Sequence, residues 1–174
     1  MPKIIENLRE KLLEEAKKQV MEQGYTAMTI RSVASACGVG VGTVYNYFPS
    51  KDMLVASFML EDWKLCLKVI QDCSRNLQEG EQLLRCIYDQ LILFQTKYAP
   101  LFSDKEAGIS FASSFPVRHQ QLRSQIAEPL LRICRAEGNV TAEFQAEFLA
   151  ESLLTWTMAG YPFEQIAGVL RKLF

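Results

Sequence analysis

Residues 29–54 read TIRSVASACGVGVGTVYNYFPSKDML, and this stretch is the most informative about the fold. Apolar side chains recur at helical spacing on both sides of Gly38, with no period-two alternation. Thr29 is a good N-cap for a first short helix. A second short helix is expected from about Gly40 to Tyr47, because the following Phe48 precedes a proline and is pushed out of the helical region. The stretch therefore predicts a helix-turn-helix.

Outward from this stretch, the remaining chain also reads at helical period. A first helix is expected from Pro2 until Gly24. Later helices are expected to begin near Ser50, Gly80, Ser103, Pro116, Thr141 and Pro162, with a kink at Pro129. The sequence thus predicts an all-α fold of about nine helices. Residues 1–48 form an N-terminal three-helix domain and residues 49–174 a C-terminal helical bundle domain.

Composition places the chain among globular proteins. Of its 174 residues, 49% are hydrophobic and 22% charged. No apolar run approaches the roughly 18 residues that span a bilayer, and the charged N-terminus does not fit a secretory signal, so a cytoplasmic location is expected. The net charge is −1, but residues 1–51 carry +2 and the remainder −3, so the basic excess lies in the N-terminal third.

The cysteines fit the same compartment. Their number is odd and no CxxC pair occurs, which is a poor disulfide framework; they are Cys37, Cys66, Cys73, Cys86 and Cys134. We expect Cys66 and Cys73 to be small apolar core residues. A thiol sensor on Cys66 and Cys73, seven residues apart on one helical face, is the alternative. With one histidine, no metal site is expected.

The second short helix carries unusual chemistry. Gly40 and Gly42 stand in its first turn, where each costs about 1 kcal/mol against alanine, and lacking side chains they allow close approach to a phosphate or base edge. The outward groups expected on it are a methyl surface, a hydroxyl, an amide and a phenol, from Val41, Thr43, Asn46 and Tyr47. Lys51 lies at the start of the next helix, where a cation is disfavoured unless it faces an anion. A solvated lysine is the alternative.

Residues 29–54 resemble the DNA-binding signature of the TetR/AcrR family of transcriptional regulators. The matching positions are Thr29, Val33, Ala34, Ala36, Gly38, Val39, Gly42, Thr43, Tyr45, Tyr47, Phe48, Lys51 and Leu54, and Gly24-Tyr25 fits the family's link between its first two helices.

The resemblance implies roles for these positions. The second short helix would be the recognition helix, with Val41, Gly42 and Thr43 at bases. Thr29, Tyr45, Tyr47 and Lys51 would hold phosphates, while Val33, Val39 and Phe48 would pack the small core between the helices. Gly40 departs from the family, which usually has a serine cap there; the loss is a few tenths of a kcal/mol and one possible phosphate ligand.

Two further expectations concern the C-terminal domain. The last two helices, expected from Thr141 to Gly160 and from Pro162 to Phe174, are apolar over more than one stripe, which indicates a dimer seam; burial within the monomer is the alternative. The resemblance implies an effector cavity, for which the candidate lining residues are Trp63, Tyr88, Phe94, Tyr98, Phe111, Phe115, His119 and Trp156. Aromatic residues at this spacing are usually core, and a histidine with core or edge contacts is the commoner case.

The sequence therefore predicts a homodimeric repressor that binds a near-palindromic double-stranded DNA operator and is released by a small-molecule effector, with no other cofactor. No nucleophile elbow, P-loop or dinucleotide fingerprint supports an enzyme. The remaining alternative is an interaction module that no longer binds DNA. Gly40, which stands where the family usually has a serine cap, would be the feature that indicates it.

Overall fold

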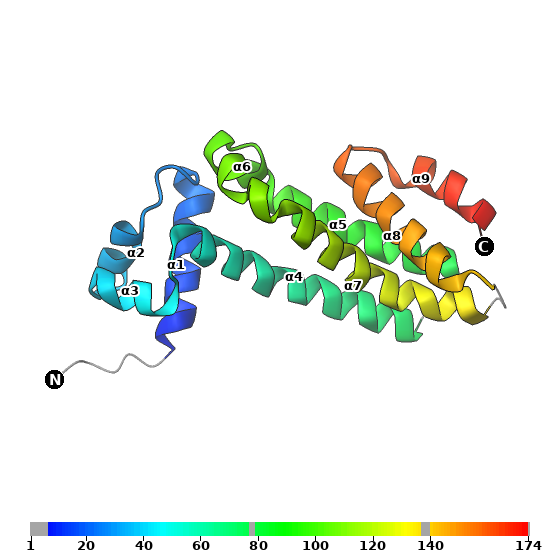
Figure 1. Cartoon of the computed structure of the whole chain (residues 1–174), viewed down its shortest axis with the longest axis horizontal. Helices are drawn as coiled ribbons and strands as arrows, with labels where there is room; N and C mark the ends of the chain where they lie inside the picture. Colours follow the sequence, from blue (N-terminus) through cyan, green and yellow to red (C-terminus); the bar gives the residue numbers. More distant parts are fainter. Residues whose placement is uncertain (1–6, 77–78, 137–139, 174) are drawn as a thin grey trace. The chain divides into compact units, whose positions relative to one another are not determined.

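The structure is a computed structural model that describes residues 7–76, 79–136 and 140–173 (Figure 1). Within these ranges it contains nine α-helices, two short 3-10 helices and no strand, which confirms the all-α prediction. The helices are α1 (Leu8–Gln23), α2 (Ile30–Ala36), α3 (Val41–Tyr47), α4 (Lys51–Asn76), α5 (Gly80–Phe102), α6 (Lys105–Phe111), α7 (Phe115–Ala136), α8 (Ala142–Met158) and α9 (Phe163–Leu170). The 3-10 helices are Ala112–Ser114 and Arg171–Leu173.

Some helix ends differ from the sequence prediction. Pro2, the expected start of the first helix, lies outside the described residues. Helix α5 contains Pro100 and ends at Phe102. The expected cap Ser103 was wrong, because its backbone N–H still bonds Ala99 O, at 3.0 Å. Asp104 caps α6 instead, its side chain accepting from Ala107 N at 3.0 Å. Pro129 lies inside α7.

Contacts divide the chain into two compact units. The first unit runs to Asp62 and includes Tyr98–Ser113; the second comprises Trp63–Lys97 and Ser114–Phe174. Helices α4 and α5 each contribute residues to both. The expected functional boundary at 48/49 stays a prediction, but the contacts group the start of α4 with the helix-turn-helix, since Leu54 and Phe58 are buried there.

The first unit packs α1, α2 and α3 around an apolar centre. Its fully buried side chains include Leu12, Met28, Val33, Val44 and Leu54. A part-buried polar network joins three helices. Lys17 of α1 donates to both carboxylate oxygens of Asp62 on α4, at 2.8 and 2.7 Å, and Tyr98 of α5 donates to Asp62 at 2.6 Å. This network holds α1 against the middle of α4 and the last turns of α5.

The second unit has the larger core. Side chains from α4, α5, α7, α8 and α9 meet there, among them Ile70, Ile87, Ile126, Leu149 and Ile166. Helices α7 and α8 run side by side (Figure 1) and make the most extensive packing between any two of the described helices. Ion pairs cross their surface, including Arg123 with Glu147 at 2.7 Å.

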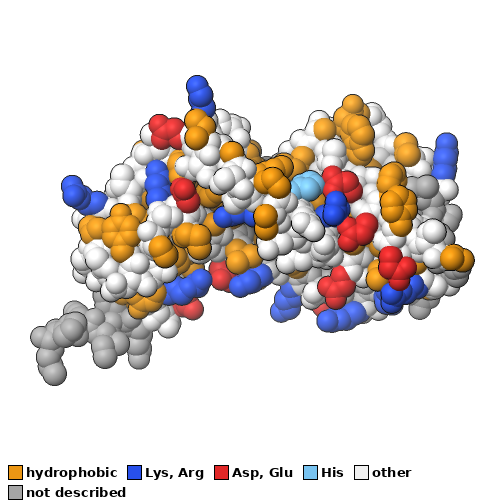
Figure 2. Space-filling view, in the orientation of Figure 1, with side chains coloured by type: hydrophobic (Ala, Val, Ile, Leu, Met, Phe, Trp, Pro, Cys, Tyr) orange, Lys and Arg blue, Asp and Glu red, His pale blue; other side chains and the backbone are white. Residues whose placement is uncertain are grey.

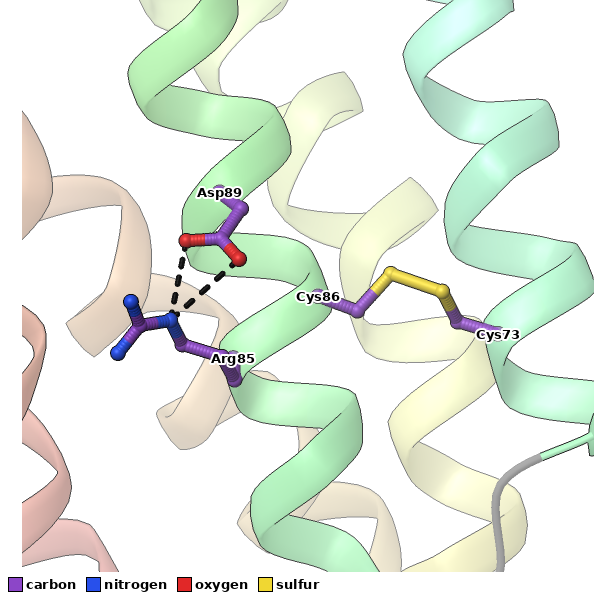
Figure 3. Close-up of a disulfide and its surroundings, with 4 residues drawn as sticks. All are labelled: Cys73, Arg85, Cys86 and Asp89. Carbon is purple, nitrogen blue, oxygen red and sulfur yellow. Dashed lines mark hydrogen bonds and ion pairs between the residues drawn. A yellow bond between two sulfur atoms is a disulfide. The ribbon is translucent and has the colours of Figure 1, made fainter.

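A disulfide corrects the cysteine prediction. Cys73 of α4 is bonded to Cys86 of α5, thirteen positions later, and Figure 3 shows the two side chains pointing towards one another across the helices. Cys66 is buried and is not the partner of Cys73. Sequence spacing reports which residues share one helix face, whereas this pair depends on how two helices pack.

Candidate nucleic-acid interface

Local chemistry builds the helix-turn-helix as predicted. Thr29 is the N-cap of α2, its hydroxyl accepting from Ser32 N at 3.0 Å, and Ser32 Oγ accepts from Thr29 N at 3.0 Å. This reciprocal capping box satisfies two donors of the first turn. The turn passes through Gly38, with a φ of 66°, a left-handed conformation that glycine adopts without steric cost. Val39 N then bonds Ala34 O at 3.0 Å and closes the turn.

Helix α3 has a buried side and an exposed side. Val44 is fully buried and Phe48, just after the helix, is 3% exposed, so these two anchor α3 on the unit. The opposite side is exposed and carries Val41, Gly42, Tyr45, Asn46 and Tyr47, while Thr43 is half-buried. Figure 2 shows hydrophobic and basic side chains together on the surface formed by this unit. The face that the sequence assigned to DNA is accessible.

The two glycines of α3 are not explained by packing within the chain. Gly40 caps the helix without a side-chain hydrogen bond, with a φ of −73° that any residue adopts. A Cβ added to Gly40 would lie 3.8 Å from Thr43 Oγ1, an ordinary contact, and one added to Gly42 would meet no atom within 4 Å. Neither turn geometry nor space therefore requires glycine at these positions.

An open hollow lies beside the exposed face of α3. Its volume is about 450 Å³, and its lining residues are Met28, Thr29, Ile30, Arg31, Val41, Tyr45 and Lys51. It therefore gathers two cations and two hydroxyl groups from α2, α3 and the start of α4. Three of these polar groups, Thr29, Tyr45 and Lys51, were predicted from the sequence.

Arg31 was missed by the sequence analysis. It is exposed, stands two residues after the N-cap Thr29 and lines the same hollow as Lys51. The sequence did contain a signal for this residue. Arg31 stands in the first turn of the first short helix, where a cation is disfavoured without an anion nearby, as argued for Lys51.

Lys51 is partly desolvated. Its Nζ lies 4.0 Å from the centre of the Tyr25 ring, a cation–π contact. Burial lowers the pKa of Lys51, while the negative charges of Glu106, Asp52 and Asp104 act in the opposite direction. The ammonium therefore lies between an aromatic face and the open hollow.

The expected effector residues are not all brought together. Six lie in the second unit, whereas Tyr98 and Phe111 belong to the first. Tyr98 is fully buried, stacks on Phe58 and bonds Asp62. Phe111 packs edge-on against Tyr25, with ring centres 6.0 Å apart.

In the second unit the candidates form separate contacts. Trp63 packs edge-on against Phe94, with ring centres 5.5 Å apart, and its Nε1 donates to Gln125 Oε1 at 2.8 Å. The ring of Tyr88 lies 5.4 Å from that of Phe163 of α9. The remaining pairs are Trp156 with Tyr161 at 5.2 Å and Phe115 with His119 at 5.7 Å.

His119 is held by the carboxylate of Glu151. Its Nε2 lies 3.0 Å from both oxygens of Glu151 on α8, and Arg123 Nη1 approaches the same carboxylate at 3.6 Å. Burial raises the pKa of Glu151, but hydrogen bonds with His119 and Thr155 outweigh it and the net shift is downward. Among the described residues, no group of three or more histidine, cysteine or acidic side chains could hold a metal ion. None of the described helices is long and apolar enough to cross a membrane.

The sequence of the chain is similar to those of known helix-turn-helix regulators. Residues 12–58 match the model of the bacterial regulatory proteins of the tetR family. The HTH-type transcriptional regulator HbdR of an Aromatoleum species is 39% identical over 51 residues, which cover 29% of this chain and 22% of that protein. The HTH-type transcriptional regulator SAB2452 of Staphylococcus aureus is 21% identical over 155 residues, covering 89% of this chain and 82% of the relative.

Solved structures show the same fold along nearly the whole chain. A TetR-family transcriptional regulator from Pectobacterium atrosepticum superposes with a TM-score of 0.71 at 16% identity, covering 95% of this chain and 91% of its own. A transcriptional regulator from Cytophaga hutchinsonii gives a TM-score of 0.66 at 18% identity, covering 94% and 93%. At such identities the likeness concerns the fold alone.

Fold and site together define a helix-turn-helix transcriptional regulator. Residues 12–58 place the helix-turn-helix of the chain in the tetR family of bacterial regulatory proteins, which are transcriptional regulators.

Proposed function

We propose that the chain binds a near-palindromic double-stranded DNA operator as a homodimer, represses transcription there, and is released by a small-molecule effector. The observation that carries the DNA-binding part is the exposed face of α3 beside a hollow that contains two cations, Arg31 and Lys51. Phosphate contacts set the orientation of such a unit on DNA, and contacts to base edges give it sequence preference.

Base reading is assigned to α3. Gly40 and Gly42 leave the start of the helix without side chains, which supports close approach to DNA because packing within the chain requires neither glycine. Val41, Thr43 and Asn46 then supply the methyl, hydroxyl and amide groups that distinguish base edges in the major groove.

Phosphate binding is assigned to the groups around the hollow. Thr29, Arg31, Tyr45 and Lys51 line it, and Tyr47 is 46% exposed on the same helix as Tyr45. The lining of the hollow contains two cations and no acidic residue, although the whole chain carries −1. Association with DNA is therefore expected to weaken as salt rises.

Dimerisation is assigned to α8 and α9. One helix-turn-helix contacts too few base pairs to select an operator, and a two-fold dimer places two recognition helices about 34–36 Å apart. Large apolar side chains are exposed on α8, including Phe144 at 73% and Phe148 at 46%, and Val169 on α9 is 64% exposed. Figure 2 shows hydrophobic side chains over this part of the surface. A second copy is the expected occupant, since a two-fold interface is self-complementary.

The effector is assigned to the second unit. Trp63 and Phe94 form an aromatic pair with a polar neighbour, Gln125, which is the mixed chemistry of small-molecule sites. The effector is expected to act by favouring a dimer state whose recognition helices no longer fit the operator.

A DNA titration with charge-matched variants tests the proposal. Lys51→Ala is expected to weaken binding to every duplex and to reduce the salt slope by about one unit. Lys68→Ala removes an exposed lysine from the same helix, away from the hollow, and should bind DNA like wild type. Thr43→Ala is expected to change sequence preference, by about 1–3 kcal/mol at one base pair.

Equal binding by all these variants would contradict the placement of the interface. Absence of wild-type binding at low salt would favour the interaction module instead, for which the missing side-chain cap at Gly40 is the supporting observation.

Sedimentation equilibrium tests the dimer. Phe148→Asp is expected to give monomers, because a carboxylate would be buried in the interface. Val117→Asp on α7, at a position 59% exposed, is the matched control and should remain dimeric. A dimeric Phe148→Asp would move the interface away from α8.

A further inference from the structure

The ammonium of Lys51 packs on the aromatic ring of Tyr25, a residue that does not itself contact DNA. Tyr25 lies in the connection between α1 and α2 and is only 4% exposed, so its ring cannot reach a nucleic acid. That ring nevertheless lies 4.0 Å from Lys51 Nζ, and Lys51 also lines the hollow beside α3. One face of the lysine is therefore defined by Tyr25 and the other by the site proposed for a phosphate.

Tyr25 is fixed from two directions. Its hydroxyl donates to the carboxylate of Asp52, the residue next to Lys51, and is hydrogen-bonded to Ser110 Oγ on α6 at 3.2 Å. Its ring packs edge-on against Phe111, also on α6. These contacts fix the position and orientation of the Tyr25 ring that packs against the Lys51 ammonium.

Helix α6 holds the neighbouring residue as well. Thr26 Oγ1 donates to Glu106 Oε2 at 3.0 Å, across 80 positions of sequence. Asp104, the N-cap of α6, and Glu106 both contribute negative charge at Lys51. Thus a helix outside the helix-turn-helix touches the α1–α2 connection by two hydrogen bonds and one ring contact, all inside the first unit.

We propose that Tyr25 is a positioning residue for DNA binding: held by Asp52 and by Ser110 of α6, its ring keeps the Lys51 ammonium at the edge of the recognition hollow. The inference rests on the proposed function and adds a route of regulation to the same site. A change at α6 alters DNA affinity through the ring and the lysine, without any contact between α6 and DNA.

A double-mutant cycle in the full-length chain separates positioning from general damage. The variants are Tyr25→Phe, Ser110→Ala and Lys51→Ala, alone and combined, and the ligand is the duplex enriched from a random pool. Tyr25→Phe keeps the ring but removes its hydroxyl tethers. Tyr25→Phe and Ser110→Ala are each expected to weaken binding about two- to fivefold, the equivalent of a surface cation–π contact. In the Lys51→Ala background both are expected to have no effect.

The matched control is Ser113→Ala, an exposed serine in the 3-10 helix that follows α6, which should bind like wild type. Equal losses in the wild-type and Lys51→Ala backgrounds would overturn the proposal, because the effect would then not pass through Lys51. Unchanged binding by Tyr25→Phe and Ser110→Ala would overturn it as well. Absence of wild-type binding would overturn the proposed function itself, and this inference with it.

A measurement without DNA checks the geometry independently. A methylene group next to an ammonium that lies over an aromatic ring experiences the ring current, so the Lys51 ε-protons are expected to resonate upfield of those of the other lysines. The upfield shift should disappear in Tyr25→Leu and change in Ser110→Ala. Lys51 resonances at the usual lysine position in the wild type would overturn the proposal whatever the DNA result.

Discussion

Reduction of the Cys73–Cys86 disulfide is expected to lower the free energy of unfolding by about 3 kcal/mol. The two cysteines are separated by 13 positions, and a cross-link that closes a loop of this length removes about that much conformational entropy, as free energy at 25 °C, from the unfolded chain. For a chain of 174 residues, a loss of this size lowers Tm by roughly 6–12 °C.

The assay is urea denaturation followed by tryptophan fluorescence, with and without a dithiol reductant. Both tryptophans, Trp63 and Trp156, lie in the second unit, which also contains the disulfide, so the signal reports on the cross-linked part of the chain. Far-UV circular dichroism follows both units, and a difference between the two probes would show that the units unfold separately.

The control is the double variant Cys73→Ser/Cys86→Ser. It should unfold at the midpoint of reduced wild type, and reductant should not move it. Coincident curves for oxidised and reduced wild type would contradict the predicted loss, because a closed loop would then have no effect on the unfolded ensemble.

Three further predictions concern buried polar groups. Asp62→Ala is expected to destabilise the first unit by about 1–3 kcal/mol, because part-buried Lys17 and the hydroxyl of buried Tyr98 lose their shared acceptor. Thermal unfolding measures this, and an unchanged midpoint would contradict it. Burial, followed by the hydrogen bond to Asp52, raises the pKa of Tyr25 from 10.0 to about 12, so the stability that the protonated hydroxyl contributes is complete below pH 10 and is lost as pH rises towards 12. Unfolding measured against pH should therefore show an alkaline loss of stability that Tyr25→Phe lacks. The same pH profile in both proteins would rule this out. Thr157 Oγ1 is buried without a hydrogen-bond partner among the described residues. Thr157→Val should therefore raise the free energy of unfolding by about 1 kcal/mol in the same unfolding assay. A lower free energy of unfolding would show that the hydroxyl is hydrogen-bonded.

Local signals in the sequence were sufficient for the helix-turn-helix. The N-cap Thr29 and the left-handed Gly38 act within a few residues of themselves, so their effect is readable without a fold. The same holds for the exposed face of α3, because helical period alone places Gly42 and Asn46 on the side opposite Val44.

Contacts between distant segments were not predictable in this way. The bond between Cys73 and Cys86 depends on how α4 and α5 pack, and the contact of Tyr25 with Ser110 joins residues 85 positions apart. The aromatic residues expected in one cavity share a residue type, but their neighbours are set by tertiary packing. Tyr98 therefore lies in the core of the first unit and Trp63 in that of the second.

The most direct test of the central claim is selection from a pool of random duplexes at two salt concentrations, with sequencing of the bound fraction. We expect enrichment of a near-palindrome with two half-sites about one helical turn apart, bound by a dimer and weakened by salt. Absence of binding at low salt, or binding without any sequence enrichment, would contradict it.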